Sequence, residues 1–132
     1  MATPIFRLVC VPRALDGAPR GWAAEMLRDG EVALLVDGGG LDAVNAVAHA
    51  LDVLAVRVLR REETPERQEE TVIAHAAALP LIWVGSAFTD AARSWARERG
   101  PMTLLVDVDG ALSADERRRI DRFVALLGRQ AE

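Results

Sequence analysis

The chain has 132 residues and a formal net charge of −4, enough for one domain with a buried core and too few residues for two. Its 51% hydrophobic and 27% charged residues are ordinary for a soluble globular protein, and the acidic balance argues against binding of duplex nucleic acid. All 16 basic residues are arginines, which excludes phosphate loops, Schiff-base enzymes and nucleases that depend on a lysine.

We expect no internal disulfide bond, no metal site and no membrane-spanning segment. The single Cys10 cannot form an internal disulfide, and no cysteine or histidine spacing resembles a zinc site. His49 and His75 lie far apart on separate helical patterns, so we expect neither a metal nor another cofactor. No signal peptide precedes Pro4, and no apolar stretch approaches the roughly 20 residues that cross a bilayer. We therefore expect a cytoplasmic protein.

Strand-length apolar runs alternate with segments of helical period along the whole chain. Gly100-Pro101 indicates the end of a helix, and Ser113 followed by Glu116 is a capping box that begins a helix. In chain order the sequence predicts strand Ile5–Val11, helix Ala18–Asp29, strand Glu31–Asp37, helix Leu41–Leu51, strand Val53–Leu59, a helix from Glu62 or Thr64 to Leu79, strand Leu81–Val84, helix Thr89–Arg99, strand Met102–Val108 and helix Ala114–Leu127.

Five apolar strands, each followed by a helix, predict a parallel sheet covered on both faces. With right-handed crossovers this is a three-layer, doubly wound, mainly parallel five-stranded α/β fold of Rossmann-like or flavodoxin-like type. No linker or domain-sized repeat interrupts residues 1–132, which we expect to form a single domain. In such sheets ligands bind at the carboxyl ends of the strands. Residues expected at that edge are Pro12-Arg13, Asp37–Gly40, Arg60-Arg61, Gly85–Ala87 and Asp107–Gly110.

The turn after the second predicted strand is the best indication of a ligand site. Asp37-Gly38-Gly39-Gly40 joins an apolar strand to a helix, an arrangement that lets a phosphate or sugar approach main-chain N–H groups. The alternative is that these glycines and aspartates only form tight turns and helix caps.

Acidic residues near the end of the chain suggest two classes of enzyme. Val106–Leu112 superficially resembles the nucleophile motif of haloacid dehalogenases, but those enzymes carry it on their first strand and use a lysine downstream. Asp37, Asp107 and Asp109 could instead form a magnesium-binding cluster as in the Toprim fold, which places a glutamate at the first position. We expect neither activity.

A wider pattern resembles a family of nucleotide-binding proteins. The segments Gly21–Gly30, Leu34–Gly40 and Ala46–Ala50 are similar to the "lonely guy"/lysine-decarboxylase-like family, and more broadly to the Rossmann-type superfamily that includes DprA and molybdenum-cofactor carrier proteins. Glu66–Gln68 resembles the segment in which phosphoribohydrolases carry a catalytic arginine, and Gly85–Thr89 resembles their phosphate loop. The resemblance spans roughly residues 18 to 108. It implies a Rossmann-type fold and a nucleotide site.

The resemblance also implies where an anion would bind. Main-chain N–H groups after Gly38–Gly40 and at Gly85-Ser86 would face a phosphate, which Arg67 or Arg13 would neutralise. Arg67 has an alternative role on a solvated helix face, because it is surrounded by possible ion-pair partners. These partners are Glu62, Glu63, Glu66, Glu69 and Glu70.

Departures from the family motif decide the functional prediction. The family's catalytic glutamate falls on Ala92, and Ser86 and Phe88 replace two loop glycines. Without that carboxylate, hydrolysis of an N-glycosidic bond loses its main catalyst. The sequence therefore predicts a nucleotide- or nucleotide-derivative-binding or sensing module that is catalytically degenerate. The predicted ligand contacts are Arg13, Asp37, Gly38, Gly39, Gly40, Gly85, Ser86, Thr89, Asp107 and Asp109.

Two alternative functions remain open. The first is a phosphoribohydrolase-like enzyme that hydrolyses a nucleotide N-glycosidic bond and uses Arg67. The second is a structural subunit without a small-molecule site, which forms a homodimer through helix residues such as Val47, Ala50 and Leu51.

Overall fold

The computed structural model describes residues 3–53 and 56–131 and contains a five-stranded sheet. The strands lie in the order β3-β2-β1-β4-β5, and each neighbouring pair is parallel. This confirms the predicted α/β fold, and the order is that of a Rossmann-type sheet. The strands are β1 (Phe6–Cys10), β2 (Gly30–Leu35), β3 (Arg57–Leu59), β4 (Leu81–Gly85) and β5 (Thr103–Asp107).

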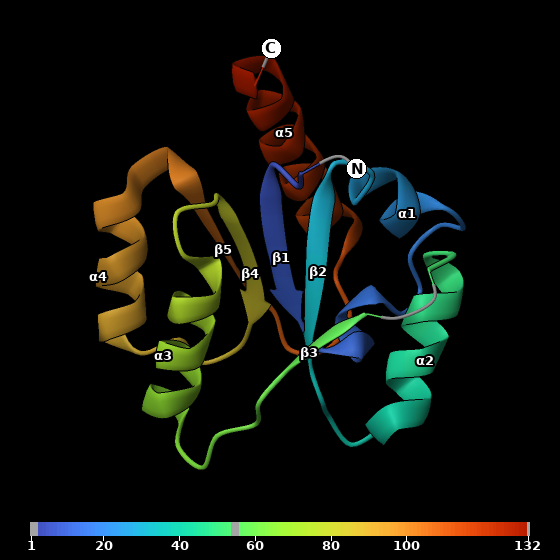
Figure 1. Ribbon diagram of the computed structural model, residues 1–132, viewed down its shortest axis with the longest axis horizontal. Helices are drawn as coiled ribbons and strands as arrows, with labels where there is room; N and C mark the ends of the chain where they lie inside the picture. Colours follow the sequence, from blue (N-terminus) through green and yellow to red (C-terminus); the bar gives the residue numbers. More distant parts are fainter. Residues whose placement is uncertain (1–2, 54–55, 132) are drawn as a thin grey trace.

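Helices cover both faces of the sheet (Figure 1). Helices α3 and α4 lie on one face, and α1 and α2 lie on the other, where α5 also packs. None of the helices in the described part of the chain is both long and apolar enough to cross a membrane. The helices are α1 (Trp22–Met26), α2 (Gly40–Ala50), α3 (Pro65–Ala76), α4 (Asp90–Arg99) and α5 (Ala114–Ala131), with 3-10 turns η1 (Pro12–Leu15) and η2 (Gly100–Met102).

Alternate side chains of β1, β2, β4 and β5 enter two separate apolar cores, whereas the edge strand β3 buries only Leu59. Phe6, Leu8 and Cys10 of β1 are at most 1% exposed and join the core beneath α1, α2 and α5. Val9, which lies between them, joins Trp83 in the core beneath α3 and α4. Because both faces are covered, these four strands can be mainly apolar, as the sequence predicted, but β3 departs from the prediction because Arg57 and Val58 are exposed.

The direction of winding reverses between β1 and β4. From β1 the chain passes through α1 to β2 and through α2 to β3, always on the same face of the sheet. Helix α3 then carries the chain to the opposite face and into β4, the other neighbour of β1. Loops that leave β1 and β4 therefore diverge at the carboxyl edge of the sheet, where α/β proteins bind their ligands.

The first predicted helix is too long at both ends. The sequence predicts a helix over Ala18–Asp29, whereas α1 covers only Trp22–Met26 and η1 forms directly after β1. Gly21, inside the predicted range, has φ of +85° and so interrupts a right-handed helix, and Gly17 just before that range has φ of +73°. An irregular segment therefore connects η1 to α1, and it borders the larger of the two hollows described below.

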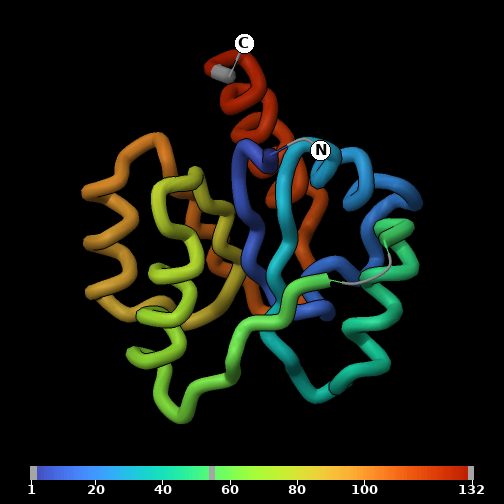
Figure 2. Tube along the Cα trace, in the orientation of Figure 1, coloured from blue at the N-terminus to red at the C-terminus, as the bar shows by residue number. Residues whose placement is uncertain are grey.

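The third strand is also shorter than predicted. The sequence predicts Val53–Leu59, and β3 covers Arg57–Leu59, paired with Ala33–Leu35 of β2. Leu54 and Ala55 lie outside the described residues. Figure 2 shows β3 at one edge of the sheet, where its chain runs on toward α3.

Candidate functional site

A crevice of about 290 Å³ opens at the carboxyl edge, between the loops that follow β1 and β4. Its buried floor contains Trp83 and Phe88, which are 4% and 9% exposed and pack edge to face with ring centroids 5.1 Å apart. Its exposed polar residues are Arg13, Ser86 and Asp109. The crevice is thus lined by buried aromatic side chains and lies where the winding reverses, which is the place that the fold favours for a ligand.

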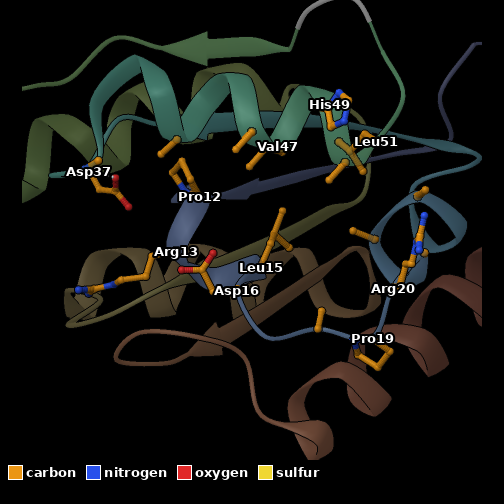
Figure 3. Close-up of a pocket in the computed structure, with 18 of the residues that line it drawn as sticks. Pro12, Arg13, Leu15, Asp16, Pro19, Arg20, Asp37, Val47, His49 and Leu51 are labelled. Carbon is orange, nitrogen blue, oxygen red and sulfur yellow. Dashed lines mark hydrogen bonds between the residues drawn. The ribbon is translucent and has the colours of Figure 1, made fainter.

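A larger groove of about 910 Å³ adjoins the crevice and is bordered by η1, α1 and α2. Figure 3 shows Asp37 and Arg13 at one end of this groove and Arg20 at the other. Pro12 and Val47 contribute to its apolar walls. Arg13 and Asp37 line both hollows, so they stand at the boundary between crevice and groove.

The triglycine turn is closed by Asp37 itself. The N–H of Gly39 donates to Asp37 Oδ1 at 2.9 Å, and the N–H of Gly40 donates to the Asp37 carbonyl at 3.1 Å. Gly40 has φ of +61°, and a Cβ on Gly39 would lie 2.8 Å from the Cβ of Ala43, so this turn requires glycine at both positions. Two N–H groups that the sequence assigned to a ligand anion are therefore engaged within the chain.

In the second glycine turn a carboxylate engages Thr89, beyond the Gly85 and Ser86 N–H groups that the sequence assigned to an anion. The N–H of Thr89 donates to Glu69 Oε2 at 2.9 Å, and the Thr89 hydroxyl donates to Glu69 Oε1. The same hydroxyl accepts from the N–H of Ala92 at 3.2 Å and so caps α4, as the sequence predicted for Thr89. A carboxylate from α3 thus lies against the N-terminus of α4, close to the Gly85–Ala87 loop that lines the crevice.

Glu69 is the residue that sequence reasoning misplaced. It was expected on the solvated face of the helix beside Arg67, but it is only 8% exposed and lines the crevice. The available signal was its spacing, because Glu69, Val72 and Ala76 share one helical face and all three are buried. A glutamate on an otherwise apolar stripe needs internal partners, and Thr89 supplies them.

The structure brings some of the predicted contact residues together and leaves others apart. Arg13, Asp37, Gly85, Ser86 and Asp109 line the crevice, and Gly38 and Gly39 line the groove. Those that do not line either hollow are Gly40, Thr89, Asp107 and Arg67.

The positions outside the hollows have identifiable partners or surroundings. Asp107, at the end of β5, forms an ion pair with Arg93 of α4 at 2.8 Å. Arg67 is exposed, and its main-chain N–H donates to the side chain of Thr64. Ala92, at the position of the family's catalytic glutamate, is 1% exposed and packs in the core beneath α4.

The two hollows differ in charge. Asp37, Glu69 and Asp109 line the crevice, where Arg13 is the basic residue. The groove has three arginines, Arg13, Arg20 and Arg61, against the carboxylates of Asp16 and Asp37. A negatively charged group is therefore better accommodated in the groove than in the crevice.

Thiol and metal chemistry find no support in this region. Burial raises the pKa of Cys10, at the end of β1, to about 12, so its thiol stays protonated and is a poor nucleophile. Within residues 3–53 and 56–131, no group of three or more histidine, cysteine, aspartate or glutamate side chains could hold a metal ion. Binding by hydrogen bonds, apolar contact and fixed arginine charge is what these hollows offer.

Comparison of the chain with models of known protein families, with curated proteins and with solved structures finds no match in any of the three. The Rossmann-like fold is therefore established by the sheet itself, through its parallel strands and their order.

Proposed function

We propose that the protein binds a nucleotide or a nucleotide-derived small molecule at the carboxyl edge of its sheet. The observation that carries this proposal is the position of Arg13 and Asp37, which follow the neighbouring strands β1 and β2 and line both hollows. In doubly wound folds an acidic residue near the end of the second strand is suited to a ribose hydroxyl, and an adjacent arginine is suited to a phosphate. The resemblance to the lysine-decarboxylase-like family supports the same class of ligand.

The ribose is assigned to Asp37. Its Oδ1 accepts the hydrogen bond from Gly39, which fixes the orientation of the carboxylate. Oδ2 is the oxygen that we assign to a ribose hydroxyl. Because the carboxylate is anionic, this hydrogen bond is of the stronger, charge-assisted kind.

The phosphate and the base are assigned to the groove. Arg13, Arg20 and Arg61 line it, so a phosphate there is neutralised by side chains and needs no glycine cradle. Apolar wall residues such as Pro12 and Val47 offer a surface for a base. This placement agrees with the hydrogen bonds of Asp37 and Glu69, which already engage main-chain N–H groups at both glycine turns.

The proposal is tested by calorimetric titration of the protein with nucleoside monophosphates. Arg13→Ala should weaken binding by about tenfold or more, since a hydrogen bond to a charged group contributes about 1.5–3 kcal/mol. Asp37→Asn keeps an acceptor for the Gly39 N–H, so the turn should remain intact. It should weaken the binding of ribose nucleotides more than the binding of their 2′-deoxy counterparts. Arg129→Ala, which removes an exposed arginine of α5 outside both hollows, is the matched control and should bind normally.

Two outcomes would replace this proposal with one of the alternatives. Release of free base from a nucleoside monophosphate, with turnover lost in Arg67→Ala, would indicate a phosphoribohydrolase-like enzyme. The carboxylates of Asp37 and Asp109 in the crevice are the observation that favours this second candidate. No thermal stabilisation by any nucleotide at millimolar concentration would favour the structural subunit, because a ligand that binds only the folded state must raise its stability.

The dimer contacts named for that structural alternative have different surroundings. Val47 is 8% exposed and belongs to the core beneath α2, whereas Ala50 is exposed at the end of that helix. The most exposed large apolar side chain in the described residues is Leu41, at 70%, in the first turn of α2. Leu41→Glu is therefore the substitution that would test a dimer through α2.

A further inference from the structure

The contact between Glu69 and Thr89 has a feature that packing alone does not require. Two oxygens of one carboxylate meet two donors at the start of α4, the main-chain N–H and the hydroxyl of Thr89. Helix α4 has 10 residues, so its N-terminus carries the partial positive charge that attracts anions. A phosphate at this position would use the same two donors. Glu69 therefore lies where a ligand's phosphate would bind if the loop acted as a phosphate loop.

Glu69 comes from α3 and is held in place by the fold. Because it is covalently part of the same chain, its effective concentration at the N-terminus of α4 is about millimolar or higher, which a free anion must exceed to displace it. The surrounding charge adds to the barrier, since Asp37 and Asp109 also line the crevice. An incoming anion would meet three carboxylates against the single arginine among the crevice residues, Arg13.

We propose that Glu69 is a specificity-determining residue that excludes phosphate and other anions from the crevice. The crevice is thereby reserved for an uncharged or hydrogen-bond-donating part of the ligand, while anionic groups are directed to the arginines of the groove. The statement about the ligand rests on the proposed function. Exclusion of phosphate by Glu69 does not, and it can be tested without a nucleotide.

The experiment compares the wild type with Glu69→Ala, Glu69→Gln and the control Glu70→Ala. Glu70 is the exposed neighbour of Glu69 on α3, so its substitution removes the same charge from the same helix and leaves Thr89 untouched. The melting temperature of each protein is measured in inorganic phosphate and in sodium chloride of equal ionic strength. Equal ionic strength matches charge screening, and the wild type and Glu70→Ala measure the general stabilisation by phosphate, so binding is the rise in excess of theirs.

Glu69→Ala vacates the position at the start of α4 and should gain a phosphate-specific rise in melting temperature of about 3 °C or more at concentrations well above its dissociation constant. The wild type and Glu70→Ala should show only the smaller rise that phosphate gives any folded protein, and the 3 °C is counted above that level. Glu69→Gln, which loses the charge and keeps the bulk, should give an intermediate response. If Glu69 only stabilised the fold, each Glu69 variant would melt at a lower temperature than the wild type, and the decrease for that variant would be equal in phosphate and in sodium chloride. That result would overturn the proposal.

A second measurement decides the matter if Glu69→Ala does not fold. In Glu69→Gln, inorganic phosphate should shift the amide resonance of Thr89 more than it does in the wild type. An equal shift in the two proteins, or a phosphate-specific shift of Thr89 in the wild type, would contradict exclusion by Glu69. Failure of the wild type to bind nucleotides would remove the proposed function and leave the phosphate result unchanged, so the two failures are distinguishable.

Discussion

A buried histidine should make the stability of this protein depend on pH between pH 7 and pH 5. The side chain of His75, near the end of α3, is 7% exposed, and its Nε2 atom is buried without a hydrogen-bond partner. It lies 3.9 Å from Glu31 Oε1, and the Nε atoms of Arg7 and Arg57 each lie 3.6 Å from that same oxygen. Burial first, and then the charges of Arg7 and Arg57, lower the pKa of His75 from 6.5, against the opposing effect of Glu31.

The direction of the effect follows from this lowered pKa. Below pH 6.5 the unfolded chain binds a proton at His75 that the folded protein does not bind, so folding becomes less favourable as the pH falls. The loss is about 1.4 kcal/mol per pH unit until the pH reaches the folded pKa, which gives at most about 2 kcal/mol between pH 7 and pH 5. Stability contributed by neutral His75 is therefore complete above pH 6.5 and declines below it.

Urea denaturation at a series of pH values, followed by circular dichroism, measures this decline. In His75→Gln the residue no longer titrates, so the free energy of unfolding should fall less steeply over the same pH range than in the wild type. His49→Gln is the matched control, because His49 is exposed at the edge of the groove and should leave the slope unchanged. Equal slopes in the wild type and His75→Gln would refute the assignment to His75.

Two further predictions concern the core beneath α1, α2 and α5. Gly30→Ala would place a methyl group 2.3–2.7 Å from three ring atoms of the fully buried Phe6 and should destabilise the protein by about 1–3 kcal/mol in urea denaturation. Adding Phe6→Leu should recover part of the stability lost in Gly30→Ala. If the double variant instead lost the sum of the two single decreases in unfolding free energy, the clash would be contradicted. Cys10 is 1% exposed with its pKa raised by burial to about 12, so a thiol reagent should modify it only after denaturation. Rapid modification of the native protein would show that β1 is less tightly packed than described.

The sequence predicts the architecture well because burial leaves a repeated pattern. Each buried strand needs an apolar run and each covering helix needs an apolar stripe, and these two periods alternate along the chain. The errors arise where one residue type can serve two local structures. Gly21 lies inside the predicted helix Ala18–Asp29, but its left-handed conformation is set by the path of the chain between η1 and α1.

The candidate site is less visible in the sequence than the fold. The strand-end residues Asp37, Gly85 and Asp109 could be placed at one edge, since parallel strands bring their carboxyl ends together. The burial of Glu69 has a local signature in its spacing with Val72 and Ala76, but its pairing with Thr89, 20 positions away, has none, because that contact depends on how α3 packs beside α4. The pairing of Arg93 with Asp107 likewise depends on the register of β5.

The aromatic floor of the crevice also provides an optical reporter at the proposed site. Trp83 is 4% exposed and stands edge to face against Phe88 and, with ring centroids 6.4 Å apart, against Trp95. Trp95 also lies beneath the guanidinium of Arg99, and Trp22 donates a hydrogen bond to the exposed Asp121. Replacing Trp22 and Trp95 by phenylalanine would leave Trp83 as the single indole, with an aromatic ring kept at the position of Trp95 beside it. Its emission would then report directly on occupation of the crevice, so that entry of a molecule could be followed in real time without a label.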